Sequence, residues 1–261
     1  MSLLAAQGLC KTFGGVVAAR DVTFSVERGE LLALIGPNGA GKTTTFNLID
    51  GQLRPDRGAV LLEGEDVTRL PPREKFRRGV GRTFQIAQTF LSMTVAENVQ
   101  MALVSHRGRH RSLLATARRL YREEALSALG QVGMSDQADR PCSTLAYGDV
   151  KRVELAVALA SEPKLLLMDE PTAGMAPRER AVLMRLAATI ARERRMGVLF
   201  TEHDMDAVFA HADRILVLVR GEIIAAGTPD EVRADARVRQ AYLGTTGAAA
   251  AARARRGRDE R

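Results

Sequence analysis

The residues best suited to chemistry lie in a glycine-rich stretch near the N-terminus. Gly36 to Thr43 read G-x-x-x-x-G-K-T, a spacing typical of loops that bind phosphate groups. Gly39 and Gly41 let the backbone turn so that successive N–H groups point inward and form an anion cradle. Lys42 can reach the β- and γ-phosphates of a nucleotide, and the Thr43 hydroxyl can ligate Mg²⁺. A chance glycine-rich turn is the alternative, but it would not require the strand and helix predicted on either side.

Two acidic residues follow a second apolar run. Asp169 and Glu170 come directly after Leu165–Met168, so a strand there would present both carboxylates at its carboxyl end. Ligands of open α/β sheets bind beyond that end of the strands. Asp169 is then placed to hold a Mg²⁺ ion that bridges the phosphates, and Glu170 to orient or deprotonate an attacking water. An Asp-Glu pair also ends many ordinary strands, so this prediction depends on the phosphate loop.

Two further polar residues follow strands in the same way. His203 comes two residues after Gly197–Thr201, from where it can hydrogen-bond a γ-phosphate. A single histidine after a strand is more often structural or solvent-exposed. Gln85 directly follows Val80–Phe84, and one neutral amide is a weak signal by itself. The residues alone therefore leave both roles open.

The elements that must position these residues are short apolar strands. Leu31–Ile35 is apolar throughout and bounded by Gly36, which is typical of a buried parallel strand. A helix that starts near Lys42 would add the positive end of its dipole to the phosphate site. The sequence also predicts strands at Val16–Ala19, Val22–Val26 and Ala59–Leu62, a helix from Pro72 to near Gly79, helices at Arg178–Arg194, Asp204–Ala210 and Pro229–Leu243, and a hairpin of Ile215–Val219 with Glu222–Ala226.

The pattern between residues 88 and 160 becomes almost entirely helical. Thr94 and Glu97 have the spacing of a capping box at a helix start. Leu113–Leu129 is amphipathic, and Val150–Leu159 reads as a further helix. This stretch is therefore predicted to form a helical subdomain within one α/β domain.

The net charge of +7 is concentrated in two places. Residues 244–261 form a low-complexity basic tail, which is predicted to be disordered. The second cluster comprises Arg69, Arg73, Lys75, Arg77, Arg78 and Arg82. Only one aromatic residue, Phe76, lies within these clusters, which does not make a stacking platform, so a nucleic-acid surface is not expected. Solvated faces, or contact with anionic lipid head groups, are the preferred interpretation.

Length, cysteines and hydropathy limit the class of protein. The 261 residues suffice for one α/β domain with an attached subdomain. Cys10 and Cys142 have no metal-type spacing, which favours a reduced cytosolic protein. We expect no signal peptide and no transmembrane helix, because the N-terminus lacks a charged start and no run of 18 apolar residues occurs.

Five motifs together resemble one family. They are GPNGAGKTT, Gln85, LAYGD (Leu145–Asp149), LLLMDEP and TEHD, in that order. The chain is similar in this respect to the nucleotide-binding subunits of ATP-binding cassette (ABC) transporters, over about residues 2–243. GLCKTFGG, GRTFQ, Tyr147, AGMAP and AYLG further resemble the ATPases of branched-chain amino acid importers.

The resemblance implies a P-loop NTPase fold with a RecA-like core, an antiparallel β-subdomain and a helical subdomain at about 88–160. It implies two such subunits, identical or different, with two ATPs and Mg²⁺ between them. Glu170, His203 and Gln85 would be catalytic, and Thr43, Gln85 and Asp169 would bind the metal. The nucleotide-binding residues would be Phe13, which stacks on adenine, and Gly36, Pro37, Asn38, Gly39, Ala40, Gly41, Lys42, Thr43, Thr44, Leu145, Ala146, Tyr147, Gly148 and Asp149. From residue types alone, Phe13 is equally compatible with a core role.

The LAYGD segment departs from the family pattern at two positions. Ala146 replaces the usual serine, so a hydroxyl that would bond the γ-phosphate is absent. Asp149 replaces the usual glutamine, and its carboxylate would repel a phosphate unless it turned away to cap the following helix. Gly148 and the helix dipole would still face the phosphate of the second subunit.

The function expected from the resemblance is ATP hydrolysis that powers an importer of branched-chain or related amino acids. Its partners would be integral membrane permeases and, indirectly, a periplasmic solute-binding protein, with this chain at the cytoplasmic side of the inner membrane. The alternatives are an exporter ATPase, for example for lipopolysaccharide, and a cassette ATPase outside transport.

Overall fold

The larger of two sheets forms the centre of the molecule. The computed structural model describes residues 2–83, 89–107 and 120–241. Within them the central sheet contains, in spatial order, β10 (Glu222–Gly227), β9 (Arg214–Val219), β3 (Leu31–Ile35), β8 (Gly197–Thr201), β7 (Leu165–Asp169) and β6 (Val80–Thr83). All neighbouring strands are parallel except β9 and β10, which form the predicted hairpin. The carboxyl ends of β3, β6, β7 and β8 therefore meet at one edge.

A smaller antiparallel sheet packs beside the central one. Its order is β2 (Val16–Val26), β1 (Leu4–Phe13), β4 (Arg57–Leu62) and the short β5 (Glu65–Asp66). Two predictions were incomplete here. β1 was not identified as a strand, and the two strands predicted between residues 16 and 26 are one continuous strand. Register shifts along the β1–β2 pair interrupt the apolar alternation that would have revealed this.

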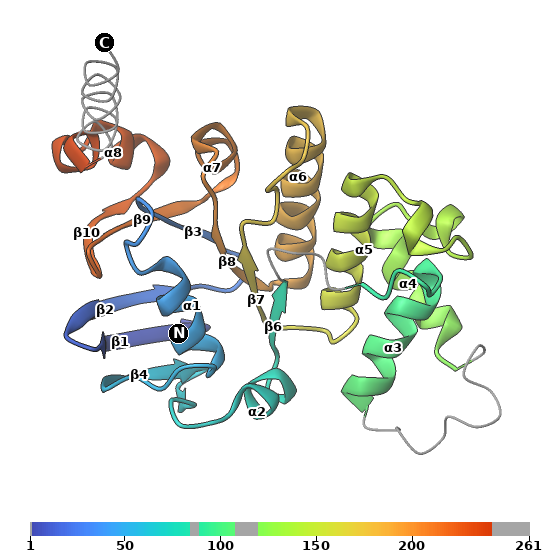
Figure 1. Ribbon diagram of the computed structural model, residues 1–261, viewed down its shortest axis with the longest axis horizontal. Coiled ribbons are helices and arrows are strands. Elements are labelled where there is room, and N and C mark those ends of the chain that lie inside the picture. Colours follow the sequence, from blue (N-terminus) through green and yellow to red (C-terminus); the bar gives the residue numbers. More distant parts are fainter. Residues whose placement is uncertain (1, 84–88, 108–119, 242–261) are drawn as a thin grey trace, which may run out of the picture.

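The helices cover both faces of the central sheet. They are α1 (Lys42–Asp50), α2 (Pro72–Arg77), α3 (Val95–Arg107), α4 (Arg122–Gln131), α5 (Tyr147–Leu159), α6 (Pro177–Arg194), α7 (Met205–His211) and α8 (Pro229–Ala234), with 3-10 turns at Ser135–Gln137 and Cys142–Thr144. Figure 1 shows α3, α4 and α5 gathered at one end, away from the antiparallel sheet. The predicted Leu113–Leu129 helix begins outside the described residues; within them Leu120 and Tyr121 form a turn, and helix α4 starts only at Arg122.

The capping box predicted before α3 is present. The Thr94 N–H donates to Oε2 of Glu97 at 2.9 Å, and the Glu97 N–H donates to the Thr94 hydroxyl at 3.2 Å. These reciprocal bonds satisfy two N–H groups that a helix start otherwise leaves without partners.

Strand β3 separates two apolar cores. Leu31, Ala33 and Ile35 pack into a cluster with the helices α3 to α6. Leu32 and Leu34 point to the opposite face, where they pack against α1 and the antiparallel sheet. Because every residue of β3 is buried, the loop that follows it is anchored on a fixed strand. None of the described helices is long and apolar enough to cross a membrane.

Candidate nucleotide-binding and catalytic site

The glycine-rich loop joins β3 to α1 at the carboxyl edge of the sheet. Gly41 directly precedes α1 with φ 106°, a left-handed conformation that side chains disfavour. A β-carbon at Gly41 would also lie 2.3 Å from the carbonyl oxygen of Ala18. Glycine is therefore required at this position for two independent reasons, conformation and space.

Lys42 folds back over this loop. Its Nζ donates to the carbonyl oxygens of Gly36 at 2.7 Å and Pro37 at 3.3 Å. Burial lowers the pKa of Lys42, while the nearby carboxylates of Glu170 and Asp169 act in the opposite direction. Because the parallel strands β3 and β7 end at the same edge of the sheet, both predicted acidic residues lie on the side of the phosphate loop. The exposed Thr43 and half-buried Thr44 follow in the first turn of α1.

Thr201, the last residue of β8, bonds the side chain of Asp169 and the backbone of Glu170. The Thr201 hydroxyl donates to Oδ1 of Asp169 at 2.8 Å, and the Glu170 N–H donates to the same hydroxyl oxygen at 3.1 Å. Glu170 itself has a left-handed backbone, with φ 49°. Such strain at a non-glycine residue is concentrated at functional sites.

His203 contacts Glu170 directly. Its Nε2 lies 2.7 Å from Oε1 of Glu170, and half of the His203 side chain is exposed. The backbone of this segment is held by Glu202, a buried residue whose Oε1 accepts bonds from the Thr172 N–H at 2.8 Å and hydroxyl at 2.7 Å. Sequence reasoning missed Thr201, Glu202 and Thr172, although Thr201 ends β8 as Asp169 ends β7.

The oxygen donors at this edge fit a magnesium ion. Mg²⁺ usually binds one or two carboxylates together with substrate phosphates, instead of a cage made only of protein ligands. Asp169 and the Thr43 hydroxyl are such donors, and the described residues contain no group of three or more His, Cys, Asp or Glu that could hold a metal alone. Gln85, the third predicted ligand, lies outside the described residues.

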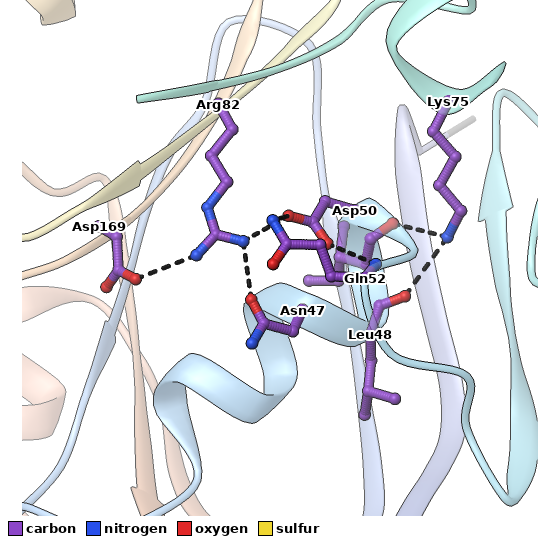
Figure 2. Close-up of polar contacts among 8 residues, drawn as sticks. Asn47, Leu48, Asp50, Gln52, Lys75, Arg82 and Asp169 are labelled. Carbon is purple, nitrogen blue, oxygen red and sulfur yellow. Dashed lines mark hydrogen bonds and ion pairs between the residues drawn. The ribbon is translucent and has the colours of Figure 1, made fainter. Parts of the chain in front are cut away.

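Arg82, from β6, reaches the same carboxylate. Its Nη2 lies 3.2 Å from Oδ2 of Asp169, while Nη1 contacts Asn47 and Asp50 of α1 (Figure 2). The prediction that the basic cluster forms solvated faces was wrong for Arg82 and for Lys75, which is only 1% exposed. Lys75 donates to backbone carbonyls at the end of α1, which satisfies its ammonium group inside the fold.

The LAYGD segment lies at the start of α5. The helix begins at Tyr147, three residues earlier than predicted, with Ala146 as the residue before its first turn. No side-chain bond caps this helix, so Asp149 does not take the capping role considered for it; its Oδ1 lies 3.9 Å from Nη1 of Arg152. The Tyr147 ring lies against Gly174: a β-carbon added to Gly174 would lie only 3.4 Å from the Cε1 atom of the ring. This packing joins the LAYGD segment to the loop that follows Glu170.

Two predicted nucleotide contacts lie at the surface. Phe13, at the end of β1, is 44% exposed, and Nζ of Lys11 lies 5.6 Å from its ring centre. Leu145 is half-buried and precedes the exposed Ala146. An exposed aromatic ring is available for stacking, and the adenine role of Phe13 stays a prediction.

Comparison with known proteins identifies the family. The family model described as "ABC transporter" matches residues 19–173. The chain belongs to the ABC transporter family. A second family model, "Branched-chain amino acid ATP-binding cassette transporter", matches residues 222–248. Members of the ABC family hydrolyse ATP to power transport, and this chain is an ABC ATPase.

Individual relatives and solved structures agree with this assignment. The chain is 40% identical over 251 residues to the high-affinity branched-chain amino acid transport ATP-binding protein LivG of Salmonella typhimurium, covering 93% of this chain and 98% of LivG. It is 39% identical over 242 residues to the lipopolysaccharide export system ATP-binding protein LptB of Acidithiobacillus ferridurans, covering 93% and 97%. The crystal structure of the ADP conformation of MJ1267, an ATP-binding cassette of an ABC transporter, superposes with a TM-score of 0.85 at 32% identity, covering 94% of this chain and 99% of MJ1267.

Proposed function

We propose that this ABC ATPase powers the import of branched-chain or related amino acids. The observation that carries the proposal is the match of residues 222–248 to the branched-chain amino acid family model. The similarity to LivG supports it over nearly the whole chain. Lipopolysaccharide export is the second candidate, because the identity to LptB is almost as high.

The proposed nucleotide site uses the edge where β3, β7 and β8 end. The N–H groups of the glycine-rich loop and Lys42 would bind the β- and γ-phosphates. Thr43, Asp169 and Gln85 would hold Mg²⁺, which neutralises phosphate charge when bound. Phe13 would stack on the adenine ring. The Lys42 ammonium would exchange its contacts with backbone carbonyls for contacts with phosphate oxygens.

The proposed chemistry is attack of water on the γ-phosphate. Glu170 would accept the proton of that water or orient it, because its carboxylate lies at the same edge as the phosphate loop. His203 holds the carboxylate through the 2.7 Å contact and would bond the γ-phosphate from its exposed side. The Thr201 hydroxyl bonds the Asp169 carboxylate and the backbone N–H of Glu170, whereas the Glu170 carboxylate contacts His203. These different surroundings suit the different roles proposed for the two carboxylates.

The complete site would need a second ATP-binding subunit, identical to this chain or different from it. The start of α5, with Ala146, Tyr147 and Gly148, would face the γ-phosphate bound by the other subunit. Because Ala146 carries no hydroxyl, the contact would rely on backbone N–H groups and the helix dipole. ATP binding would close this pair of subunits and hydrolysis would reopen it. Integral membrane permeases would receive this motion, and a periplasmic solute-binding protein would deliver the solute. This arrangement places the chain peripherally, at the cytoplasmic side of the inner membrane.

Reconstitution tests the transported solute. The chain would be co-expressed with the permease genes that neighbour its own gene, and the complex placed in vesicles together with the corresponding solute-binding protein. We expect uptake of radiolabelled leucine that depends on internal ATP and is lost in the Lys42→Ala complex. If the solute-binding protein binds neither a branched-chain amino acid nor a related one, or if the chain co-purifies with lipopolysaccharide-exporting membrane subunits, the import proposal is wrong.

A further inference from the structure

The guanidinium of Arg82 connects two carboxylates that belong to different elements. It extends from β6, with Asp169 of β7 on one side and Asn47 and Asp50 of α1 on the other (Figure 2). Nη2 lies 3.2 Å from Oδ2 of Asp169, and Nη1 lies 2.7 Å from Oδ1 of Asn47 and also contacts Asp50. The side chains of Arg82, Asp50 and Asp169 are only 13%, 9% and 13% exposed, so solvent screens these contacts weakly.

The α1 side of this network is firmly held. The Asp50 carboxylate accepts two bonds from Gln52, from its N–H at 2.9 Å and its Nε2 at 3.0 Å. The Phe46 ring centre lies 5.9 Å from the Arg82 guanidinium carbon. Lys75 donates to the carbonyl of Ile49 at 2.7 Å, which fixes the end of α1. Arg82 is thus anchored on α1 whether or not it contacts Asp169.

The Asp169 side is where a cation would compete. Oδ1 of Asp169 accepts the Thr201 hydroxyl at 2.8 Å, and Oδ2 contacts Arg82. A magnesium ion bound through Asp169 would place two positive charges near the guanidinium, and like charges repel strongly at a weakly solvated site. Either Arg82 moves away from Asp169 or the metal binds less tightly.

We propose that Arg82 is a positioning residue that competes with the metal ion for Asp169 and retreats to Asn47 and Asp50 when the metal binds. The inference rests on the proposed assignment of Asp169 as a metal ligand. Without metal, Arg82 neutralises Asp169 and limits its repulsion of nucleotide phosphates. Arg82 therefore reduces the dependence of nucleotide binding on Mg²⁺. Because β6 carries Arg82 and leads toward Gln85, metal binding would also change the contacts of that strand.

The test measures how much Mg²⁺ strengthens nucleotide binding. The dissociation constant of fluorescent mant-AMP-PNP, which is not hydrolysed, is measured in EDTA and in saturating Mg²⁺. The ratio of the value in EDTA to the value in Mg²⁺ is then compared between variants. In Arg82→Met the ratio should rise roughly 3- to 10-fold, in the lower part of the range for directly contacting groups, because Asp169 then repels the metal-free nucleotide. In Asp50→Asn the ratio should fall, because Arg82 loses an anchor and pairs more strongly with Asp169.

Three further variants separate this role from a structural one. The double variant R82M/D50N removes both charges of the Arg82–Asp50 pair and leaves Asp169 charged, so its ratio should rise as in R82M. Arg82→Lys keeps the charge but not the planar fork, so its ratio should lie between wild type and R82M. Arg77→Met removes an exposed arginine that pairs with Glu74, and its ratio should stay at the wild-type value.

The outcomes distinguish the assignment of Asp169 as a metal ligand from the competition between Arg82 and the metal. In Asp169→Asn the ratio should fall toward one; if it does not, Asp169 is not the metal ligand and the site assignment fails. If D169N behaves as expected but R82M and D50N shift the ratio in the same direction, or not at all, the competition is wrong and Arg82 only stabilises the fold. Thermal unfolding of each variant confirms that the compared proteins are folded.

Discussion

The imidazole of His203 and the carboxylate of Glu170 form a direct contact, with Nε2 2.7 Å from Oε1. The two residues come from neighbouring parallel strands, since Glu170 follows β7 and His203 follows β8 by two residues. Asp169 pairs with Thr201 in the register of these strands, which brings the residues after them together. The contact therefore follows from the sheet topology, and its role can be tested by replacing either residue.

Replacing Glu170 with glutamine should abolish hydrolysis while preserving nucleotide binding. The amide has nearly the same shape and can still contact His203, but it cannot accept a proton from water. Turnover should fall about 100-fold or more, within the usual contribution of a general base. Single-turnover hydrolysis and mant-ATP binding measure the two properties separately. A variant that keeps wild-type turnover would show that Glu170 is not the base.

His203→Ala and Glu170→Gln should not have additive effects. To the extent that the imidazole acts by holding the carboxylate, removing the imidazole lowers the rate little once the carboxylate is gone. The rate losses of residues that act as a unit are not additive. Because His203 is also proposed to bond the γ-phosphate, we expect its removal to slow Glu170→Gln as well, but by a smaller factor than it slows the wild type. Rate losses that multiply would indicate that His203 acts on the phosphate independently of Glu170.

Alanine at Gly41 should be far more harmful than alanine at Gly39. Both glycines have positive φ, 106° and 78°, so both substitutions introduce backbone strain of about 1 kcal/mol or more. Only at Gly41 would the new β-carbon meet backbone, 2.3 Å from the Ala18 carbonyl oxygen, whereas nothing lies within 4 Å at Gly39. Gly41→Ala should lower the melting temperature clearly more than Gly39→Ala. Equal losses would mean that the loop shifts to relieve the clash.

The sequence was sufficient for the features that depend on local pattern. The glycine-rich loop, the apolar strands β3, β7 and β8 and the residues at their ends follow from spacing and hydropathy. Arg82 and Lys75 were misjudged because a basic residue is normally solvated, and only tertiary structure supplies the acceptors, Asp50 and the α1 carbonyls, that permit burial. Glu202 was missed for the same reason, since its partner Thr172 is 30 residues away in the chain.

Lys75 should make stability depend on pH in the alkaline range. Burial lowers its pKa from 10.5 to about 8, so between these values the unfolded chain holds a proton that the folded chain has lost. Stability therefore rises with pH across this window, and the penalty for charging Lys75 is fully present below about pH 8. Relative to Lys75→Met, which cannot titrate, wild type should gain on the order of 1–2 kcal/mol in unfolding free energy between pH 7 and 9.5. Urea unfolding of both proteins at the two pH values measures this difference. A constant difference would show that Lys75 stays charged in the folded protein, held by Asp50 and the carbonyls of α1.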